Sequence, residues 1–292
     1  MRFNLVDVFA ESAYSGNPLA VFFCERALPA EMMQRIANEI HFSESVFVLS
    51  SQEEDEGWPV RIFTPLHEVA FAGHPSLGAA YIISQTLFDR PVSTVKLRAK
   101  AGLIPVYLSP ERNGPLWMDQ IPPLFGETLP ASELAPVLGL PVEAIDGRYP
   151  VQEVSTGLPH ILVPLVSLEA LKEAKIDRER YFRLVEKTWA KPILVFSLQG
   201  RDSTHQVSVR MFADYLGVSE DPATGSGNGC LAGYLVKHRV LGAQEVSLVS
   251  GQGHEIGRPS HLFLEGRDQE GGALSVRVGG RVVDTASGEW SL

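Results

Sequence analysis

Short apolar runs, bounded by glycine, proline or polar residues, recur along the whole chain. Most are rich in valine, isoleucine, leucine and phenylalanine, a pattern typical of β-strands. We expect strands at residues 5–9, 20–23, 46–49, 60–63, 95–99 and 103–108, and near the end of the chain at 273–278 and 281–283.

Fewer stretches have a helical pattern. We expect helices at residues 29–39, 75–88, 131–138, 178–187 and 230–239. Many strands, few helices and no regular alternation between the two predict an α+β fold.

Two sequence landmarks occur twice and in the same order. Ser15-Gly16-Asn17-Pro18 and Thr156-Gly157-Leu158-Pro159 each lead into an apolar run, and Val60-Arg61-Ile62-Phe63 recurs as Val209-Arg210-Met211-Phe212. A glycine turn and a helix of small residues then follow in both halves. The copies are separated by about 140 to 150 residues, which favours internal duplication over the chance recurrence of common dipeptides. Two copies predict two similar domains that face each other, not a solenoid.

The breaker-rich segment 119–126 is the expected linker between these domains. We therefore expect an N-terminal domain at residues 1–118 and a C-terminal domain at 119–280. The pattern does not assign the C-terminal strand, at about residues 281–292, which could join the first domain.

The segment Glu220–Gly229 has the most distinctive composition in the chain. Two acids and a proline lead into three glycines spaced by small polar residues, and the apolar run 230–236 follows at once. A glycine-rich helix start leaves backbone N–H groups unpaired and attracts an anion. Asp221 and Ser226 would add side-chain chemistry beside it.

Three other interpretations of this segment are weaker. Residues 227–232 match the dinucleotide-binding pattern G-x-G-x-x-A, but the nearest expected strand ends at Phe212 and no βαβ unit is indicated. No lysine follows the glycines, which excludes a Walker loop. The helix expected directly afterwards argues against a flexible linker.

Glu44 lies between two serines at the start of an apolar strand. Burial there would raise its pKa and suit it to take up a proton and return it elsewhere. The alternative, a Glu44 that faces water beside a serine-capped turn, stays open at this point.

His74 is held between Gly73 and a helix-starting proline. The positive end of the helix dipole there favours a neutral imidazole, although a purely structural histidine fits as well. His67, Glu68 and His74 do not form H-E-x-x-H and no Cys/His set accompanies them, so no metal site is expected.

The repeat places Gly73-His74 and Gly225-Ser226 at equivalent helix starts. If the halves pack about a pseudo-two-fold axis, both starts converge on one cleft, where a small acid would lie. That packing is an assumption that the sequence does not prove.

Composition narrows the possible partners. With 45% hydrophobic residues, a net charge of −10 and no basic block, the chain is not expected to bind nucleic acid or anionic membranes. No apolar run approaches the roughly 18 residues of a membrane span, and the N-terminus lacks a signal-peptide core. The two cysteines, Cys24 and Cys230, lack C-x-x-C spacing, so we expect a cytoplasmic protein without disulfides or zinc.

Taken together, the motifs resemble those of the phenazine-biosynthesis PhzF-like family, within the diaminopimelate-epimerase-like fold. The similarity runs almost end to end, through residues 7–9, 16–18, 43–45, 61–65, 73–75, 156–159, 220–229 and 257–260. It implies two β-barrel-like domains, each around a central helix, with the active site between them. It also implies a homodimer and no cofactor.

The same resemblance assigns roles to residues. Glu44 would abstract a proton and return it elsewhere on the same molecule. His74, Asp221 and Ser226 would orient the substrate and stabilise the shifted charge, with amides near Gly73, Gly225 and Gly227 binding it.

One departure is important. Epimerases and racemases of this fold use two cysteines at these helix starts, where this chain has Ala72-Gly73 and Ala223-Thr224. The favoured function is therefore a cofactor-independent isomerase that shifts a proton within a small carboxylate-bearing metabolite, of the trans-2,3-dihydro-3-hydroxyanthranilate isomerase type. An epimerase or racemase, and a non-catalytic metabolite-binding homologue, are the alternatives.

Overall fold

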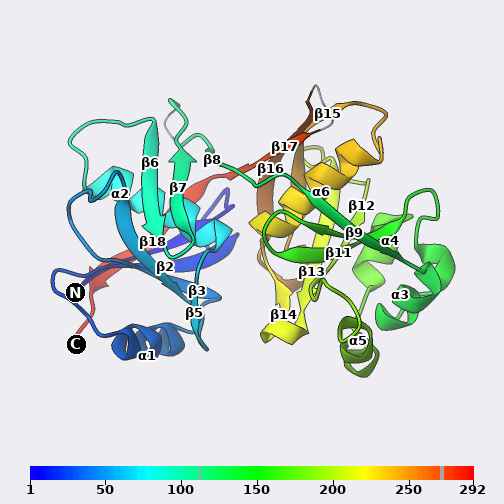
Figure 1. The fold of residues 1–292 in the computed structure, drawn as a ribbon, viewed down its shortest axis with the longest axis horizontal. Helices are drawn as coiled ribbons and strands as arrows, with labels where there is room; N and C mark the ends of the chain where they lie inside the picture. The colour runs from blue at the N-terminus through cyan, green and yellow to red at the C-terminus, as the bar shows by residue number, and fades with distance from the viewer. Residues whose placement is uncertain (112, 270–272) are drawn as a thin grey trace. The chain divides into compact units, whose positions relative to one another are not determined.

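The computed structural model describes residues 1–111, 113–269 and 273–292. These residues form a mixed fold with many strands and few helices (Figure 1), as the apolar pattern predicts. The chain divides into two compact units. Unit 1 comprises Met1–Met118 and Gly279–Leu292, and unit 2 comprises Asp119–Val278.

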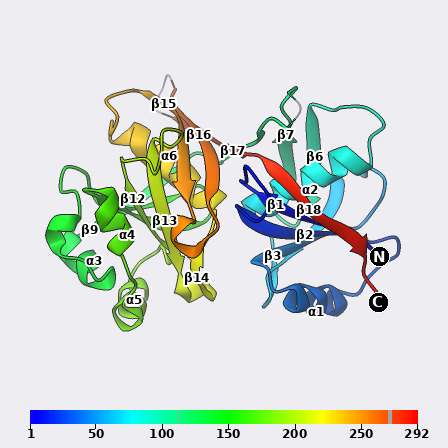
Figure 2. The ribbon, with the colours of Figure 1, turned by 180° about the vertical axis from the view of Figure 1, so that it is seen from behind.

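Unit 1 is built on a sheet in which neighbouring strands follow the order β18, β1, β2, β3, β4, β6, β7 and β8. The pairs β2–β3 and β4–β6 are parallel and the others are antiparallel, and the short β5 pairs with β4. The strands are β1 (Arg2–Val8), β2 (Asn17–Phe23), β3 (Glu44–Val48), β4 (Trp58–Phe63), β5 (Glu68–Val69), β6 (Thr94–Ala99), β7 (Gly102–Tyr107), β8 (Leu116–Asp119) and β18 (Val282–Glu289). Figure 2 shows β18 beside β1.

Unit 2 has a sheet with the order β9, β10, β11, β12, β13, β15 and β16, and the short β14 pairs with β13. Here β11–β12 and β13–β15 are the parallel pairs. The strands are β9 (Leu124–Leu129), β10 (Val151–Ser155), β11 (Pro159–Leu165), β12 (Ile193–Ser197), β13 (Val207–Ala213), β14 (Val218–Asp221), β15 (Glu245–Gln252), β16 (Ser260–Asp268) and β17 (Leu274–Gly280), whose last two residues belong to unit 1.

The two sheets repeat one series of pairings. From β1 to β7 and from β10 to β16, each strand makes the same kind of pair, parallel or antiparallel, with the corresponding neighbour. Strand β18 pairs with β1 as β9 pairs with β10. The recurring V-R-x-F segments are the matching strands β4 and β13, so the sequence landmarks mark a true structural repeat.

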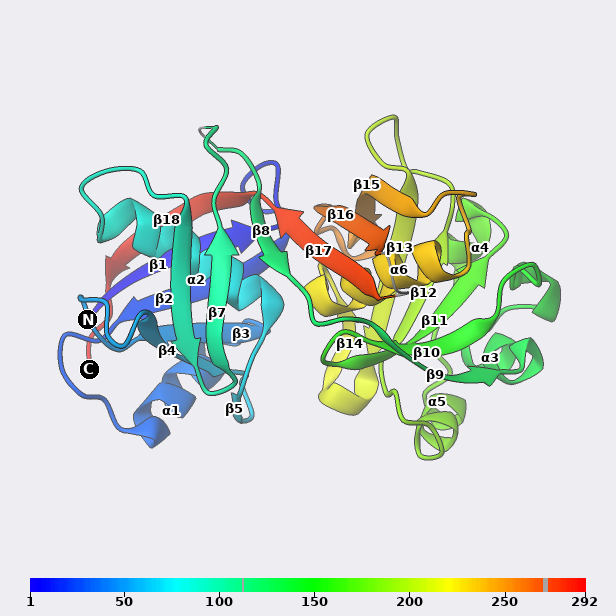
Figure 3. The ribbon, with the colours of Figure 1, turned by 45° about the horizontal axis from the view of Figure 1, so that its top comes forward.

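Each unit contains one buried helix, α2 (Gly73–Thr86) in unit 1 and α6 (Gly225–Lys237) in unit 2. Helix α2 packs on β1, β2, β3, β6, β7 and β18, and α6 packs on β10, β11, β15 and β16 (Figure 3). Both helices are apolar and small on nearly all sides, as expected of fully buried helices. At Gly78, a Cβ would lie 2.4 Å from a Leu19 methyl, so a larger residue would push α2 off the sheet.

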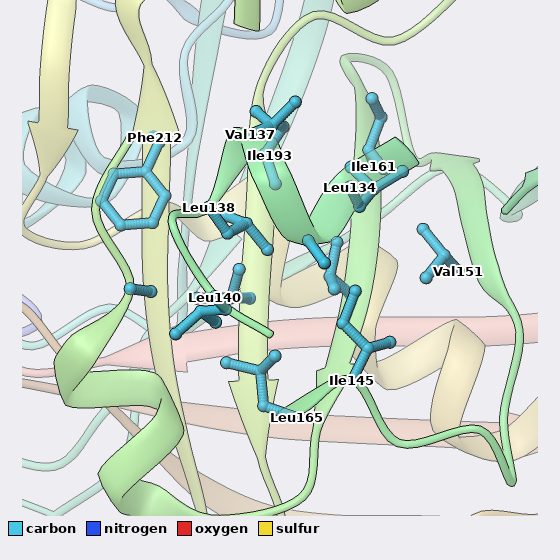
Figure 4. Close-up of a cluster of buried hydrophobic side chains, with 14 of the residues drawn as sticks. Leu134, Val137, Leu138, Leu140, Ile145, Val151, Ile161, Leu165, Ile193 and Phe212 are labelled. Carbon is cyan, nitrogen blue, oxygen red and sulfur yellow. The ribbon is translucent and has the colours of Figure 1, made fainter. Parts of the chain in front are cut away.

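Shorter amphipathic helices cover the other face of each sheet. In unit 1, α1 (Ala30–Ile40) buries Met33, Ile36 and Ala37, which share one helix face, against the sheet. In unit 2, α3 (Ala131–Val137), α4 (Leu168–Glu173) and α5 (Arg178–Val185) enclose the apolar cluster of Figure 4. Single 3₁₀ turns lie at Val142–Ala144, Asp214–Leu216 and His254–Ile256.

Three expectations from the sequence are wrong in detail. Helix α6 begins at Gly225, five residues before the expected start, so the glycines lie inside its first turns. A strand, β14, ends at Asp221, much closer to the glycines than Phe212. β13 and β15 also pair in parallel on either side of α6, a crossover that the sequence did not indicate. The antiparallel β14 intervenes, however, and a dinucleotide loop needs its glycines in a turn between a parallel strand and its helix.

No helix among the described residues is long and apolar enough to cross a membrane.

Candidate active site

In unit 1, Glu44 is the first residue of β3, and its side chain lies against the start of α2. Its Oε2 atom is 3.6 Å from Nε2 of His74, and the Glu44 side chain is 20% exposed. Side chains alternate along the strand, so the next residue, Ser45, is fully buried on the opposite face of the sheet. Glu44 is thus partly sheltered and does not face open water, which was the alternative left open by the sequence.

His74 is the second residue of α2 and is buried. Burial lowers the pKa of its imidazole to about 3, so the ring is neutral at physiological pH. Neutrality was expected from the helix dipole, but loss of hydration is the physical cause in the structure. The separation from Glu44 exceeds hydrogen-bond length, and Nε2 has no other hydrogen-bond partner among the described residues. At this distance, the neutral ring can donate a hydrogen bond to a substrate group bound beside the carboxylate, or accept one from it.

In unit 2, Asp221 is the last residue of β14 and is 9% exposed. Its Oδ2 accepts a hydrogen bond of 2.5 Å from the Thr224 hydroxyl. Pro222 and Ala223 form the connection, and α6 then begins at Gly225. Asp221 therefore lies directly beside the first turn of this helix.

Ser226 and Gly227 lie in that first turn. Ser226 is half-buried, and its carbonyl oxygen accepts a hydrogen bond from Thr156. At Gly227, a Cβ would lie 2.9 Å from a Leu194 methyl, so a side chain here would have to displace Leu194, and glycine lets α6 approach its sheet closely. The residue thus has a packing role whatever it binds.

Helices α2 and α6 begin alike. Among the described residues, no side chain caps the first turn of either helix. The first-turn amides of both helices are therefore not occupied by a capping side chain, and their binding of a negatively charged group stays a prediction.

Bidentate ion pairs hold the segment in front of each helix. Arg61 contacts Glu68 with two N–O distances of 2.8 Å in unit 1. Arg210 contacts Glu220 with two of 2.9 Å in unit 2. Each pair joins the V-R-x-F strand to the short strand that precedes the buried helix, and so fixes the direction from which the helix starts.

The cysteines are unsuited to proton transfer. Burial raises the pKa of the Cys24 thiol to about 11 and that of the Cys230 thiol to about 12, so neither forms a thiolate near neutral pH. Within the described part of the chain, no three His, Cys, Asp or Glu side chains are grouped as a metal site would require.

The structure thus brings Glu44 and His74 together in unit 1, and places Asp221 and Ser226 around the start of α6 in unit 2. That all four act on one substrate stays a prediction. The sequence missed two residues of the unit 2 site, Thr224 and Gln252, which contact Asp221. Thr224 lay within the glycine-rich segment, whereas a single glutamine at a strand end carries no sequence signal.

Known proteins share this fold and sequence. The chain matches the family described as phenazine biosynthesis-like protein over residues 6–288. The trans-2,3-dihydro-3-hydroxyanthranilate isomerase of Pseudomonas aeruginosa is 34% identical, and the match covers 98% of each protein. A PhzF-family phenazine biosynthesis protein from Bacillus anthracis has a TM-score of 0.90 and 27% identity, covering 100% of this chain and 99% of that one.

A more distant structure shares the fold alone. A probable proline racemase from Agrobacterium radiobacter is 12% identical with a TM-score of 0.64, covering 100% of this chain and 93% of that chain. The relatives that are similar in sequence over nearly their whole length are named as isomerases, which confirms the expected enzyme class. With a family match over almost all of its residues, the chain belongs to the phenazine biosynthesis-like (PhzF) family.

Proposed function

We propose that this protein is a cofactor-independent isomerase that moves a proton between two atoms of one small carboxylate-bearing molecule. The observation that carries the proposal is the pair formed by Glu44 and His74. A partly sheltered carboxylate lies 3.6 Å from a buried imidazole that burial keeps neutral. Such a carboxylate can accept a proton and return it, while the neutral ring supplies hydrogen bonds without adding charge.

Glu44 is the general acid/base in this proposal, and His74 orients the substrate and stabilises the shifted charge. In unit 2, Asp221 and Ser226 are assigned to binding, together with the amides at the start of α6. The amides near Gly73, Gly225 and Gly227 are the expected anion-binding groups. What supports these assignments is the uncapped start of both helices and the burial of Asp221.

The nature of the substrate is a separate proposal. The relative from Pseudomonas aeruginosa is named for trans-2,3-dihydro-3-hydroxyanthranilate. A carboxylate-bearing ring of this class matches open helix amides, which stabilise a carboxylate. We further propose a barrel-like sheet around each buried helix, a pseudo-two-fold relation of the two units, a homodimer and a cytoplasmic location, as the family resemblance implies.

A second candidate function, epimerisation or racemisation by two thiols, is not favoured by any observation. Both thiols are buried with pKa values of about 11 and 12. Neither could act as a base at neutral pH.

The proposal is tested by proton exchange. Trans-2,3-dihydro-3-hydroxyanthranilate and a panel of small cyclic and linear acids are incubated with the protein in D₂O, and deuterium incorporation is followed by NMR. We expect incorporation at one new carbon with the wild type and none above background with Glu44→Ala. Glu39→Ala, at an exposed position on α1, is the matched control and should behave as the wild type.

Two results would contradict the proposal. Undiminished exchange in Glu44→Ala would show that another group moves the proton. Tight binding of one acid without exchange would indicate a metabolite-binding homologue that lacks turnover.

A further inference from the structure

Thr224 occupies the N-cap position of α6 but does not cap the helix. A threonine in this position normally accepts a hydrogen bond from an amide of the first turn. Here its hydroxyl donates to Oδ2 of Asp221 at 2.5 Å, and α6 begins without a side-chain cap among the described residues. The hydroxyl of Thr224, which is best placed to cap the helix, is therefore bonded to the Asp221 carboxylate instead.

Gln252 holds Thr224 in this arrangement. It is the last residue of β15 and is fully buried. Its Nε2 donates to the Asp221 carbonyl oxygen at 2.8 Å and to the Thr224 hydroxyl oxygen at 3.0 Å. Its Oε1 accepts from the Thr224 N–H at 3.2 Å and from Nδ2 of Asn228 at 2.8 Å.

These contacts fix which end of the Gln252 amide is which. A backbone N–H can only donate and a carbonyl can only accept, so the oxygen must face the Thr224 N–H and the nitrogen must face the Asp221 carbonyl. The nitrogen thereby occupies a lone pair of the Thr224 hydroxyl, whose proton already goes to Asp221. The hydroxyl is held away from the amides of α6 by both of its partners.

The turn around Asp221 is supported from the same side. Gly253, next to Gln252, approaches so closely that a Cβ would lie 2.6 Å from the Pro222 carbonyl oxygen. The Ser260 hydroxyl donates to that same oxygen at 2.9 Å. Ser260 is the last residue of the segment 257–260, which resembles a motif of the PhzF-like family and to which the sequence assigned no role. The end of β15 and the start of β16 thus hold the turn that carries Asp221.

The other buried helix reaches the same uncapped state differently. The N-cap residue of α2 is Ala72, which has no side-chain acceptor. In α6 the N-cap residue could cap and is prevented from doing so. A contact that only stabilised the fold would not need to suppress the cap.

We propose that Gln252 is a positioning residue: it keeps the Thr224 hydroxyl on Asp221 and so leaves the first-turn amides of α6 open to the carboxylate of the substrate. That the bound group is the substrate carboxylate rests on the proposed function. That Gln252 positions the Thr224 hydroxyl is independent of it.

The decisive experiment is native-state amide hydrogen exchange followed by NMR, which needs no substrate. Gln252→Met removes both donors at similar volume, so the Thr224 hydroxyl oxygen can accept from a first-turn amide while its proton stays on Asp221. Exchange at the Ser226 and Gly227 amides should then slow by about fivefold, the effect of an average N-cap. The double variant Gln252→Met/Thr224→Val should lose this protection. Ser250→Ala is the matched control, because Ser250 is fully buried in β15 and its hydroxyl has no partner among the described residues.

The sign of the change separates a positioning role from a structural one. Removing a merely structural contact would loosen the helix start and speed exchange, so equal or faster exchange in Gln252→Met would overturn the proposal. Gln252→Glu is the second variant if Gln252→Met does not fold. It retains oxygen acceptors for Thr224 and Asn228 but loses both donors, and the same slowing is expected.

Kinetics with trans-2,3-dihydro-3-hydroxyanthranilate, or with the acid that exchanges in D₂O, then test the link to the substrate. Gln252→Met should raise KM by about fivefold, since capped amides bind the carboxylate less well, while Ser250→Ala stays within about twofold of the wild type. Slowed amide exchange in a protein that turns over no acid would refute the proposed function. It would still support the role of Gln252 in positioning the Thr224 hydroxyl. Slowed amide exchange with an unchanged KM would refute the binding role of α6.

Discussion

Units 1 and 2 have the same strand pairings and the same buried helix, but different side chains at matching positions. The register of β3 and β12 makes Ser45 equivalent to Ile193, and so Glu44 is equivalent to Pro192. The carboxylate proposed to move the proton therefore exists in unit 1 only.

The converse holds for the second acid. In the pairing of β5 with β4, and of β14 with β13, Val69 occupies the position of Asp221. The starts of the buried helices match His74 with Ser226. Each unit thus has one of the two proposed acids, on a different strand, and a different polar side chain at the start of its buried helix.

Both units share the contacts that hold the start of the buried helix. The ion pair in front of the helix occurs twice, and so does a side chain that bonds back to the N-cap carbonyl, Ser76 to Ala72 and Asn228 to Thr224. We call these shared contacts, the ion pair and the bond to the N-cap carbonyl, the frame of each helix start. The two frames have the same topology, whereas the proposed catalytic and binding side chains differ between the units. Replacing a frame residue should therefore change stability, and replacing a proposed catalytic residue should change turnover.

The largest effect is expected from replacing Glu44, the first residue of β3, and little effect from replacing its counterpart Pro192, which precedes β12. Glu44→Gln keeps size and hydrogen-bonding capacity but removes the base, so kcat should fall by about 10²- to 10⁴-fold, the usual contribution of general acid–base catalysis. Pro192→Ala should leave kcat within about twofold. Steady-state assays on the acid identified in D₂O measure both. A similar loss of kcat in Pro192→Ala would show that the two units do not differ in this way.

The shared ion pairs should differ in strength because they differ in burial. Arg210 and Glu220 have side chains only 9% exposed, and Arg210 also donates to the carbonyls of Leu171 and Ala174. Arg210→Met leaves a buried carboxylate and these carbonyls unpaired, so we expect a loss of about 3 to 5 kcal/mol in the free energy of unfolding.

The unit 1 pair, Arg61 and Glu68, is 28% and 24% exposed, and Arg61→Met should cost only about 1 kcal/mol. Urea denaturation of the two variants, followed by circular dichroism, gives the difference. Equal losses would mean that burial does not distinguish the two frames.

The buried imidazole of His74 predicts a pH dependence that its counterpart Ser226 cannot give. Its pKa is about 3 in the folded protein and about 6.5 when exposed, so the unfolded chain binds the proton first as pH falls. Stability is therefore fully present above pH 6.5 and is lost progressively as pH falls from there towards 3. At pH 5 the loss from this group is about 2 kcal/mol.

His74→Gln should remove this component and flatten the stability profile between pH 7 and 5. Some slope remains, because burial also lowers the pKa of His160 and of His254 to about 4. Urea midpoints measured at several pH values provide the test. An unchanged slope in His74→Gln would show that His74 is accessible to protons in the folded state.

The elements that were predicted well from sequence have strong local patterns. Helices α1, α3 and α5 begin within one residue of the expected start, because apolar residues recur at helical spacing. The start of α6 was missed because glycine has low helix propensity, whereas Gly225, Gly227 and Gly229 are buried in the structure, where packing overrides that propensity. Strand β14 was missed because its polar residues are held by β13 and by Arg210.

For the site, residue types could be predicted but contacts could not. Glu44 and His74 stood out individually, from a strand start and a helix start. Their contact depends on the packing of α2 against β3, which no local pattern encodes. Gln252 acts through four hydrogen bonds made by a single buried amide, and a lone glutamine gives no sign of this before the fold is known.

The smallest expected difference lies in the side chains that bond back to the N-cap carbonyls. Ser76 donates to the Ala72 carbonyl oxygen at 2.8 Å, while its own N–H reaches the same oxygen at 3.3 Å. Ser76→Ala leaves that oxygen satisfied and should cost about 1 kcal/mol. Asn228 donates both to the Thr224 carbonyl oxygen and to Gln252. Asn228→Ala should cost roughly 2 kcal/mol, because it removes two hydrogen bonds instead of one, although the Thr224 carbonyl oxygen keeps the Asn228 N–H at 3.0 Å and Gln252 keeps the Thr224 N–H.

Thermal and urea unfolding of both variants would measure this difference of about 1 kcal/mol. Ser250→Ala, which removes a buried hydroxyl without a partner among the described residues, calibrates the cost of removing a buried polar atom alone. If Ser76→Ala were as costly as Asn228→Ala, the unit 2 helix start would gain nothing from its connection to Gln252. The bonds back to the N-cap carbonyls would then be equivalent in the two units, and the two frames would differ in energy only through the burial of their ion pairs.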